Sequence, residues 1–362
     1  MSGVMLRPVR DDDAEAVWDL LAPVQSEVIG MSSLPSSPTS AKRACAETAD
    51  TIAALATGSF TLDEQAHRRL LFIAVERNAE PDGTSGSGSN TSTSEQVLGI
   101  TGITFKNAVL NLAVQVSTSE DGHGLIMRST SSPWTRTELD STFLGPSARG
   151  KRLGSLVSRG RFMLLHLVHS QIPSTVASHL RGRFDDDGSA PFWRCFGAHF
   201  APEWETSTEA EHALIENPHR LQDLADHRLA LTAPVLDSLG PVNAASLPAF
   251  HMLRAEGLNP NGMYDPIDGG PTLRAELADT VTGKTRTHGR AVIEDLDADA
   301  TRGESAPERR LVDALVSVTT VARFRVTRAT VALGESGPIG ISAETADALN
   351  IGEDTLIVAA PL

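Results

Sequence analysis

The sequence predicts an α+β fold, a sheet flanked by helices, followed by a smaller β-rich module at the C-terminal end. Three observations predict it. Short apolar segments typical of strands alternate with segments of helical spacing through the first three quarters of the chain. Residues 138–154 join a strand, through a basic and glycine-bearing turn, to a long helix. From residue 290 onward, short strand-like segments dominate the pattern.

The N-terminal elements follow from apolar spacing and from capping residues. Strands are predicted where short apolar runs stand between polar segments, at 4–9, 70–75, 97–104 and 109–116. Three aspartates at 11–13 cap an amphipathic helix, and residues 41–56 again have helical spacing after a Ser/Pro loop at 30–40. Residues 80–96 are almost all Ser, Thr, Gly and Asn, which predicts a disordered loop because so little apolar surface cannot offset the ordering entropy. Residues 121–136 are expected to be irregular.

The second half begins with a strand at 138–144 and a helix at 153–170. That helix is apolar around much of its circumference, so it is expected to pack on more than one side. Later elements are expected as a strand at 175–180, a polar loop at 181–190, helices at 191–197 and 247–256 that each end in glycine, and a strand to 264. In the C-terminal module, strands are predicted at 292–293, 324–326, 329–333 and 355–360, with one capped helical turn at 341–349.

The start of the helix at 153–170 is the most informative position. A helix start leaves backbone N–H groups unpaired and carries partial positive charge, and Arg149, Lys151 and Arg152 surround it. Such a corner can hold a phosphate or diphosphate. The alternative is a solvated basic helix start.

Composition excludes several classes of function. The chain has 362 residues and a formal net charge of −15, which argues against general nucleic-acid binding. Two cysteines, Cys45 and Cys195, indicate a reducing compartment and give no zinc site. No long apolar run is present, so we expect a soluble cytoplasmic protein that needs neither membrane nor metal.

The order of strand, basic turn, long helix, strand and glycine-ended helix resembles the acetyltransferase-like (GNAT) fold, a mixed twisted sheet that binds acyl-coenzyme A between two splayed strands. A narrower resemblance, to the arginine N-succinyltransferases, is carried by blocks spread over most of the chain. They are Phe143-Leu144-x-Pro146, Arg149 with Gly154, Ser158-Arg159-x-Arg161-Phe162-Met163, Arg181-Gly182, Asp187-Gly188-x-x-Pro191-Phe192-Trp193, Leu253-x-x-Glu256-Gly257-Leu258 and Asp265-x-x-Asp268-Gly269-Gly270-Pro271-Thr272-Leu273.

The resemblance implies an acyl-CoA site on the strand and turn that follow residue 141. The implied coenzyme-binding residues are Thr142, Phe143, Leu144, Arg149, Gly150, Lys151, Arg152, Leu153, Gly154 and Ser155. Thr142 stands where the family has a leucine that contacts succinyl-CoA, and Arg152 replaces the first glycine of the turn. Asn243 stands where the family has its catalytic histidine, and asparagine does not exchange a proton at neutral pH. The segment at 109–136 is shorter than its family counterpart.

Charged residues outside the turn have open roles. Arg159 and Arg161 are expected either to reach phosphates or a carboxylate of the ligands, or to lie on a solvated helix face. Arg181, Asp265 and Asp268 are expected to bind the substrate. For the two aspartates, a tight turn built on Asp-Gly-Gly-Pro is the favoured alternative.

The sequence therefore predicts an acyl-CoA-binding domain over 1–200, a second half-domain over 201–285 and a β-rich module over 290–362. The resemblance implies transfer of a succinyl or similar acyl group from coenzyme A to the α-amine of arginine, in arginine catabolism, by a homo- or hetero-oligomer. Two alternatives stay open: a transferase for another amine, and a weakly active or inactive acyl-CoA-binding subunit paired with an active paralogue.

Overall fold

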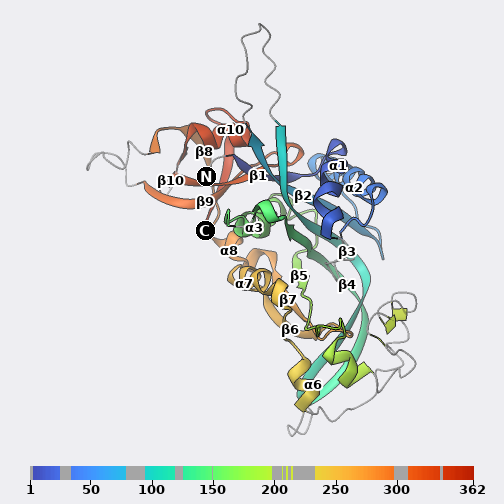
Figure 1. Cartoon of the computed structure of the whole chain (residues 1–362). Helices are drawn as coiled ribbons and strands as arrows, with labels where there is room; N and C mark the ends of the chain where they lie inside the picture. Colours follow the sequence, from blue (N-terminus) through green and yellow to red (C-terminus); the bar gives the residue numbers. More distant parts are fainter. Residues whose placement is uncertain are drawn as a thin grey trace.

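The computed structural model describes residues 3–24, 34–78, 94–118, 125–148, 150–197, 206, 209–210, 213–214, 233–296, 309–334 and 337–362. Its strands form one twelve-stranded sheet in the order β11-β8-β12-β9-β10-β1-β2-β3-β4-β5-β7-β6. The N-terminal strands lie at its centre, and the C-terminal strands form one end (Figure 1). The mixed sheet, the flanking helices and the β-rich C-terminal module confirm the predicted fold class.

The N-terminal segment supplies the central strands and the helices of one face. Strand β1 (Val4–Pro8) pairs antiparallel with β2 (His67–Asn78), and α1 (Ala14–Leu21) and α2 (Pro38–Thr57) connect them. Helix α2 begins three residues before the predicted 41–56, because Ser37 caps it through the backbone N–H of Ser40 and a proline occupies its first position. It ends at Gly58, whose φ of 71° suits glycine.

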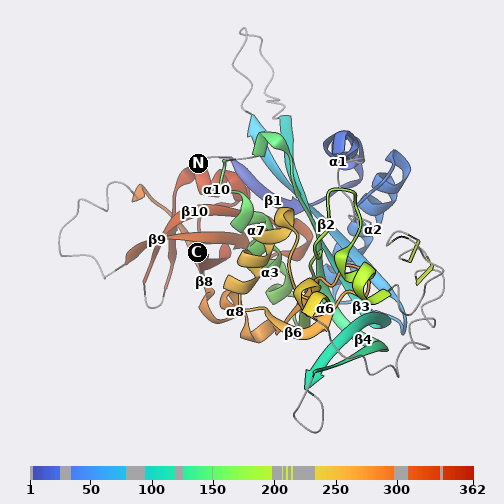
Figure 2. The same cartoon turned by 60° about the horizontal axis from the view of Figure 1, so that its bottom comes forward.

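Strands β3 (Ser94–Thr118) and β4 (Leu125–Leu144) form one long antiparallel hairpin (Figure 2). The expectation of irregular structure at 121–136 is therefore wrong from residue 125 onward. Exposed Ser132, Pro133 and Thr135 give this stretch no apolar alternation, and its backbone pairs with β3 all the same. Of the polar segment at 80–96, residues 94–96 belong to β3 and residues 80–93 lie outside the described residues.

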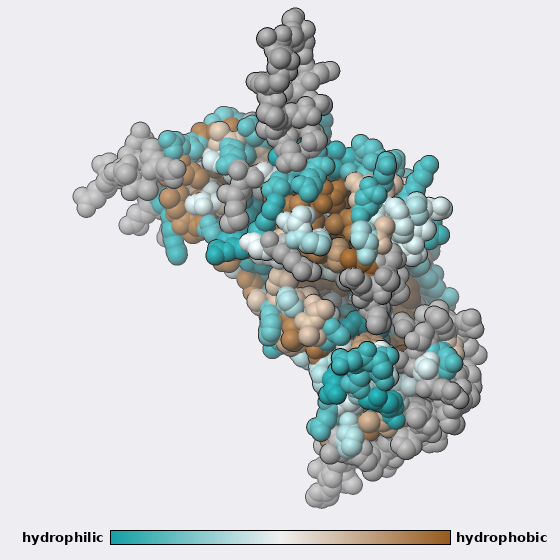
Figure 3. Space-filling view, in the orientation of Figure 1, coloured by the Kyte–Doolittle hydropathy of each residue, from teal (hydrophilic) through white to brown (hydrophobic). Residues whose placement is uncertain are grey.

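Helix α3 (Gly154–Leu167) crosses the opposite face of the sheet and leads to β5 (Thr175–His179). Between α3 and the sheet lies the largest core, which includes Leu156, Phe162 and Phe72. A second core, with Leu71, Ile73 and Ile100, lies under α1 and α2, and Figure 3 shows hydrophobic residues gathered beside these helices. The alternation of β2 between the two cores follows from the two-residue period of a strand.

The next segment completes the sheet beside β5. Helices α6 (Ala233–Ser238), α7 (Leu247–Ala255) and α8 (Val281–Thr285) accompany β6 (Asn259–Tyr264) and β7 (Pro271–Glu276). Strand β7 pairs with β5 and with β6, and β6 returns to β3 through Val114 and Tyr264. The predicted helix at 247–256 and the strand that follows it are confirmed.

The C-terminal strands are β8 (Thr287–Ile293), β9 (Arg310–Val318), β10 (Val326–Leu333), β11 (Ile339–Ile341) and β12 (Leu356–Pro361), with α10 (Ala343–Leu349) between the last two. They close into a ring because β11 pairs with both β8 and β10. The sequence did not lead us to expect β9. Strand β10 also pairs with β1, at Leu6 with Val326, so the module continues the central sheet.

Candidate active site

Strands β4 and β5 run parallel for a short distance and then part. Their register pairs Thr137 with Val176 and Glu138 with Ala177, and it contains no further pair among these described residues. Strand β4 nevertheless continues to Leu144, and the Ser178 hydroxyl reaches the Leu139 carbonyl at 2.9 Å. This β4–β5 separation is the feature that an acyl-CoA-binding sheet of the predicted type requires.

A bulge in β4 lies directly beside the separation. The register with β3 pairs Gly102 with Asp140 and Ile100 with Phe143, so two residues of β4 oppose one residue of β3. Ser141 takes the left-handed conformation, with φ of 57°, which costs a non-glycine residue energy. The Thr142 hydroxyl shares a hydrogen bond of 2.8 Å with Thr101. Thr142, one of the predicted coenzyme-binding residues, therefore lies on an irregular stretch of backbone.

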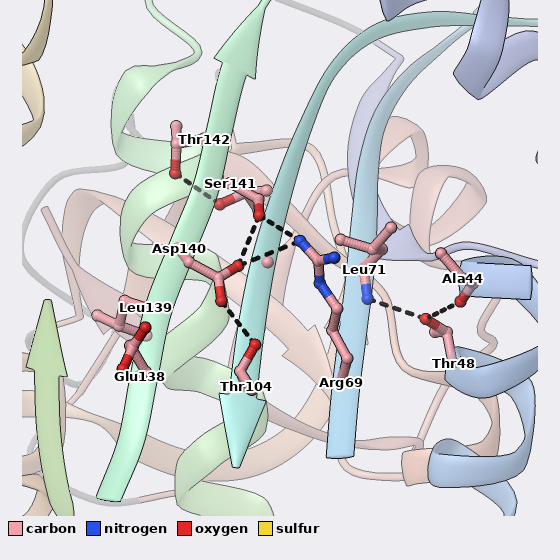
Figure 4. Close-up of polar contacts among 12 residues, drawn as sticks. Ala44, Thr48, Arg69, Leu71, Thr104, Glu138, Leu139, Asp140, Ser141 and Thr142 are labelled. Atoms are coloured by element: carbon pink, nitrogen blue, oxygen red, sulfur yellow. Dashed lines mark hydrogen bonds and ion pairs between the residues drawn. The ribbon is translucent and has the colours of Figure 1, made fainter. Parts of the chain in front are cut away.

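A polar network links the bulge to the neighbouring strands on the α1–α2 face (Figure 4). Arg69 of β2 donates to the Ser141 hydroxyl at 2.5 Å, and Ser141 donates to the Asp140 carboxylate at 2.7 Å. Thr104 of β3 donates to the other Asp140 oxygen at 2.6 Å. A Cβ added to Gly102 would clash with this carboxylate, so the glycine permits the close approach. The network fixes the charged and hydroxyl groups around the bulge.

Arg161 of α3 holds the bulge from the opposite face. It is 3% exposed and donates from Nη1 to the carbonyls of Gly102 at 3.1 Å and Asp140 at 3.3 Å. Burial lowers its pKa to about 10, against the attraction of Asp140. Both expectations for this residue, a phosphate contact and a solvated face, are therefore wrong.

Arg159 also points into the protein. Its Nε donates at 2.7 Å to Glu256, which is fully buried and also accepts from the backbone N–H of Thr282. Its Nη1 donates to the Pro361 carbonyl at 3.1 Å. The expectation of a ligand contact or a solvated face fails here as well, because Arg159 ties α3 to α7, α8 and the last strand.

The basic turn has the uncapped helix start that was predicted, but one of its cationic side chains is already paired with a carboxylate. Gly150 and Arg152 have positive φ values of 80° and 53°, and no side chain caps the first turn of α3 at Leu153. The Lys151 ammonium is bound to Glu76 at 2.7 Å, and Arg149 lies outside the described residues. An anion at this helix start would therefore meet backbone N–H groups and the exposed Arg152.

A cavity of about 1060 Å³ opens between this turn and the C-terminal module. Gly150 and Leu153 form one wall, and β10 and α10 contribute Thr330 and Ser342 to another. Its charged lining residues are Glu76, Glu294, Asp295, Asp313, Glu344, Lys151, Arg152 and Arg328. Carboxylates outnumber cations, so only the rim at the start of α3 suits a polyanion.

The predicted substrate residues meet at one place beyond β5. Arg181 donates to the Asp268 carboxylate at 3.2 Å, and Asp268 is 1% exposed. Burial and the charge of Asp265 raise the pKa of Asp268 to about 7, against the opposing effect of Arg181. Asp265 accepts the backbone N–H groups of Ile267 and Asp268, which is the geometry of the turn alternative.

Asn243 lies beside this cluster. Its backbone N–H donates to the Arg181 carbonyl at 2.9 Å, and its side-chain oxygen accepts from Ala245, capping a short 3₁₀ helix. The structure thus brings Asn243, Arg181 and Asp268 together.

A second charged group lies on β4 and was not predicted from the sequence. Glu138 accepts from Lys106 at 2.9 Å and from Arg136 at 2.8 Å, and His179 of β5 lies 3.5 Å from the same oxygen. The signal was present in the sequence, because Arg136, Glu138 and Asp140 alternate as charged residues along one face of a central strand.

Two features are absent from the described residues. Within these ranges no helix is long and apolar enough to cross a bilayer. The same residues contain no group of three or more His, Cys, Asp or Glu side chains that could hold a metal ion.

Comparison with known proteins agrees with this geometry. Residues 4–282 match the model of the family described as "Arginine N-succinyltransferase beta subunit", and residues 300–361 match that of its C-terminal domain. An arginine N-succinyltransferase of Yersinia enterocolitica is 29% identical over 173 residues, 45% of this chain and 48% of that protein. The subunit beta of Pseudomonas aeruginosa is 30% identical over 144 residues, 39% of this chain and 42% of that protein. The chain thus spans about half the length of the curated relatives it matches.

A solved structure extends the likeness to the whole fold. The arginine/ornithine succinyltransferase subunit AI of Pseudomonas aeruginosa superposes with a TM-score of 0.72 at 19% identity, covering 100% of this chain and 99% of that one. At this identity the match describes the fold.

Proposed function

We propose that this chain, which belongs to the arginine N-succinyltransferase beta subunit family, transfers a succinyl group from coenzyme A to the α-amine of arginine. One observation carries the proposal: the β4–β5 separation lies beside a strained bulge and leads to the uncapped start of α3. Acyl-coenzyme A requires this combination, because its thioester and its diphosphate lie at opposite ends of one extended arm.

The coenzyme would lie along β4 and the basic turn. Its diphosphate would be held by the N–H groups at the start of α3 and by Arg152, with Gly150 giving the backbone close access. Backbone N–H groups near Ser141 and Thr142 would polarise the thioester carbonyl, and one such donor is worth about 3–4 kcal/mol in an acyl transfer. Phe143 and Leu144 would line the path of the arm.

The acceptor would approach from the side on which Asp140 and Glu138 lie, because carboxylates bind the guanidinium or amine of arginine. Arg181 and Asn243 lie at the end of β5, where they would orient the acceptor. Asn243 supplies hydrogen bonds and cannot serve as the base.

The test is a thiol-release assay with the full chain, succinyl-CoA and arginine. Release of free coenzyme A that depends on arginine supports the proposal. Turnover only with another amine would instead identify a transferase with a different acceptor. Tight binding of coenzyme A with no release for any amine would favour the inactive-subunit alternative, to which the asparagine at position 243 points.

A further inference from the structure

His179 occupies a position at which the sheet opens. It is the last residue of β5, and the parallel register ends two residues earlier, at Glu138 with Ala177. If the register continued, His179 would lie opposite Asp140, the residue that begins the β4 bulge. Its side chain is 31% exposed. It is thus a titratable group beside the predicted acyl site, on the α1–α2 face and accessible to solvent.

The two ring nitrogens of His179 have different surroundings. Nδ1 lies 2.9 Å from the Thr272 hydroxyl of β7, a normal hydrogen-bond length. Nε2 lies 3.5 Å from Glu138, which exceeds the usual range for such a bond. The edge of the Trp134 ring packs against the imidazole, with 6.3 Å between ring centroids. Thr272 therefore fixes the ring through Nδ1, and Nε2 faces the Glu138 carboxylate.

Glu138 is the negatively charged partner of His179. Burial opposes its charge, but His179, Lys106 and Arg136 together hold the pKa of this carboxyl well below its usual range. The carboxylate stays ionised at neutral pH and stabilises positive charge on a neighbouring imidazole or amine. Lys106 from β3 and Arg136 from β4 keep it in place.

We propose that His179 is the proton acceptor of the transfer reaction and that Glu138 and Thr272 position it. In the step, the nitrogen lone pair of the acceptor amine forms a bond to the thioester carbonyl carbon, and the carbon–sulfur bond breaks. The proton leaves the nitrogen for Nε2 of His179, and the thiolate of coenzyme A departs. Solvent then takes the proton from the imidazolium. This inference rests on the proposed function, and it gives the chain a base although position 243 is asparagine.

The test compares His179→Gln with wild type and with His288→Gln, an exposed histidine of β8 that serves as a matched control. We expect kcat to fall about 10²–10³-fold in His179→Gln, with an unchanged KM for the acyl-CoA. His288→Gln keeps full activity. Free imidazole restores turnover to His179→Ala.

The pH profile separates a base from a structural residue. Glu138 is the charged group nearest to His179, and Lys106 and Arg136 contact Glu138. Asp140 lies two residues farther along β4, and Arg274 lies two residues from Thr272 on β7; Thr272 and Trp134 are uncharged. Wild-type kcat/KM should rise with pH through an inflection, and this inflection should vanish in His179→Gln. Activity within threefold of wild type with the inflection intact would overturn the inference.

A failure of the proposed function can be distinguished from a failure of the His179 inference. If wild type releases no coenzyme A with any amine, that function falls and the catalytic role of His179 falls with it. NMR of histidine-labelled protein titrated with arginine then tests separately whether the acceptor binds beside His179. A shift of the His179 ring signals without a shift at His288 supports the acceptor position beside His179. Unchanged His179 signals at saturating arginine reject it.

Discussion

Replacing Arg161 with methionine tests whether the buried guanidinium stabilises the protein through its hydrogen bonds or destabilises it because a charge is buried. The side chain gives up three hydrogen bonds to carbonyls, those of Gly102, Asp140 and Ser158. At about 1.5 kcal/mol for each bond from a charged donor, the loss is about 5 kcal/mol. The cost of burying the charge opposes this loss. It is reflected in the pKa of Arg161, which burial lowers to about 10. Lowering the pKa from 12.5 to about 10 corresponds to a penalty of about 3 kcal/mol, which is absent when residue 161 is methionine.

The hydrogen bonds outweigh the cost of burial, and Arg161→Met should lose about 1–2 kcal/mol of unfolding free energy. Urea titration followed by circular dichroism measures it, with Arg161→Lys as the control that keeps the charge. Because two of the three bonds end on Gly102 and Asp140, the residue pair next to the bulge, kcat should fall by about tenfold or more as the backbone relaxes. A methionine variant as stable as wild type, or more stable, would refute the reasoning and show that charge burial dominates, as in some buried ion clusters.

Two further outcomes follow from the charged residues. Arg152→Glu should weaken coenzyme A binding about tenfold in calorimetry, since it reverses a charge at the start of α3; an unchanged Kd would contradict the diphosphate position. Asp268 has a folded-state pKa of about 7, above its unfolded value, so the folded chain binds the proton more tightly and stability falls as pH rises from 4 to 7. Asp268→Asn should flatten this slope, which reaches about 1.4 kcal/mol per pH unit; a pH-independent difference between the two proteins would exclude the raised pKa.

Local signals predicted much of the fold. The glycine-bearing basic turn, the long helix after it, and the glycine-ended helix before β6 are all present. Each depends on residues within one or two turns, such as the glycine at position 257 with its φ of 105°. The Asp-Gly-Gly-Pro turn is likewise local, because Asp265 accepts the backbone N–H groups of Ile267 and Asp268.

Long-range partners explain what the sequence could not predict. Arg159 meets Glu256 97 residues away, and Arg69 meets Ser141 72 residues away, so no local pattern predicts either pair. The buried position of Arg161 could have been predicted from the sequence. A helix that is apolar around most of its circumference has no solvated face to offer, and an arginine on such a helix has to satisfy its donors on backbone carbonyls.

The C-terminal module is attached directly to the core and lines the cavity beside the basic turn. Strand β10 pairs with β1, and Arg159 of α3 donates to the Pro361 carbonyl of the last strand. The same module forms the far wall of the cavity whose near wall is Gly150 and Leu153. A shift of the module would therefore move the cavity wall that faces the basic turn and would strain the contact between Arg159 and the last strand. If the turn binds the coenzyme as proposed, deleting the module should weaken that binding as well as destabilise α3.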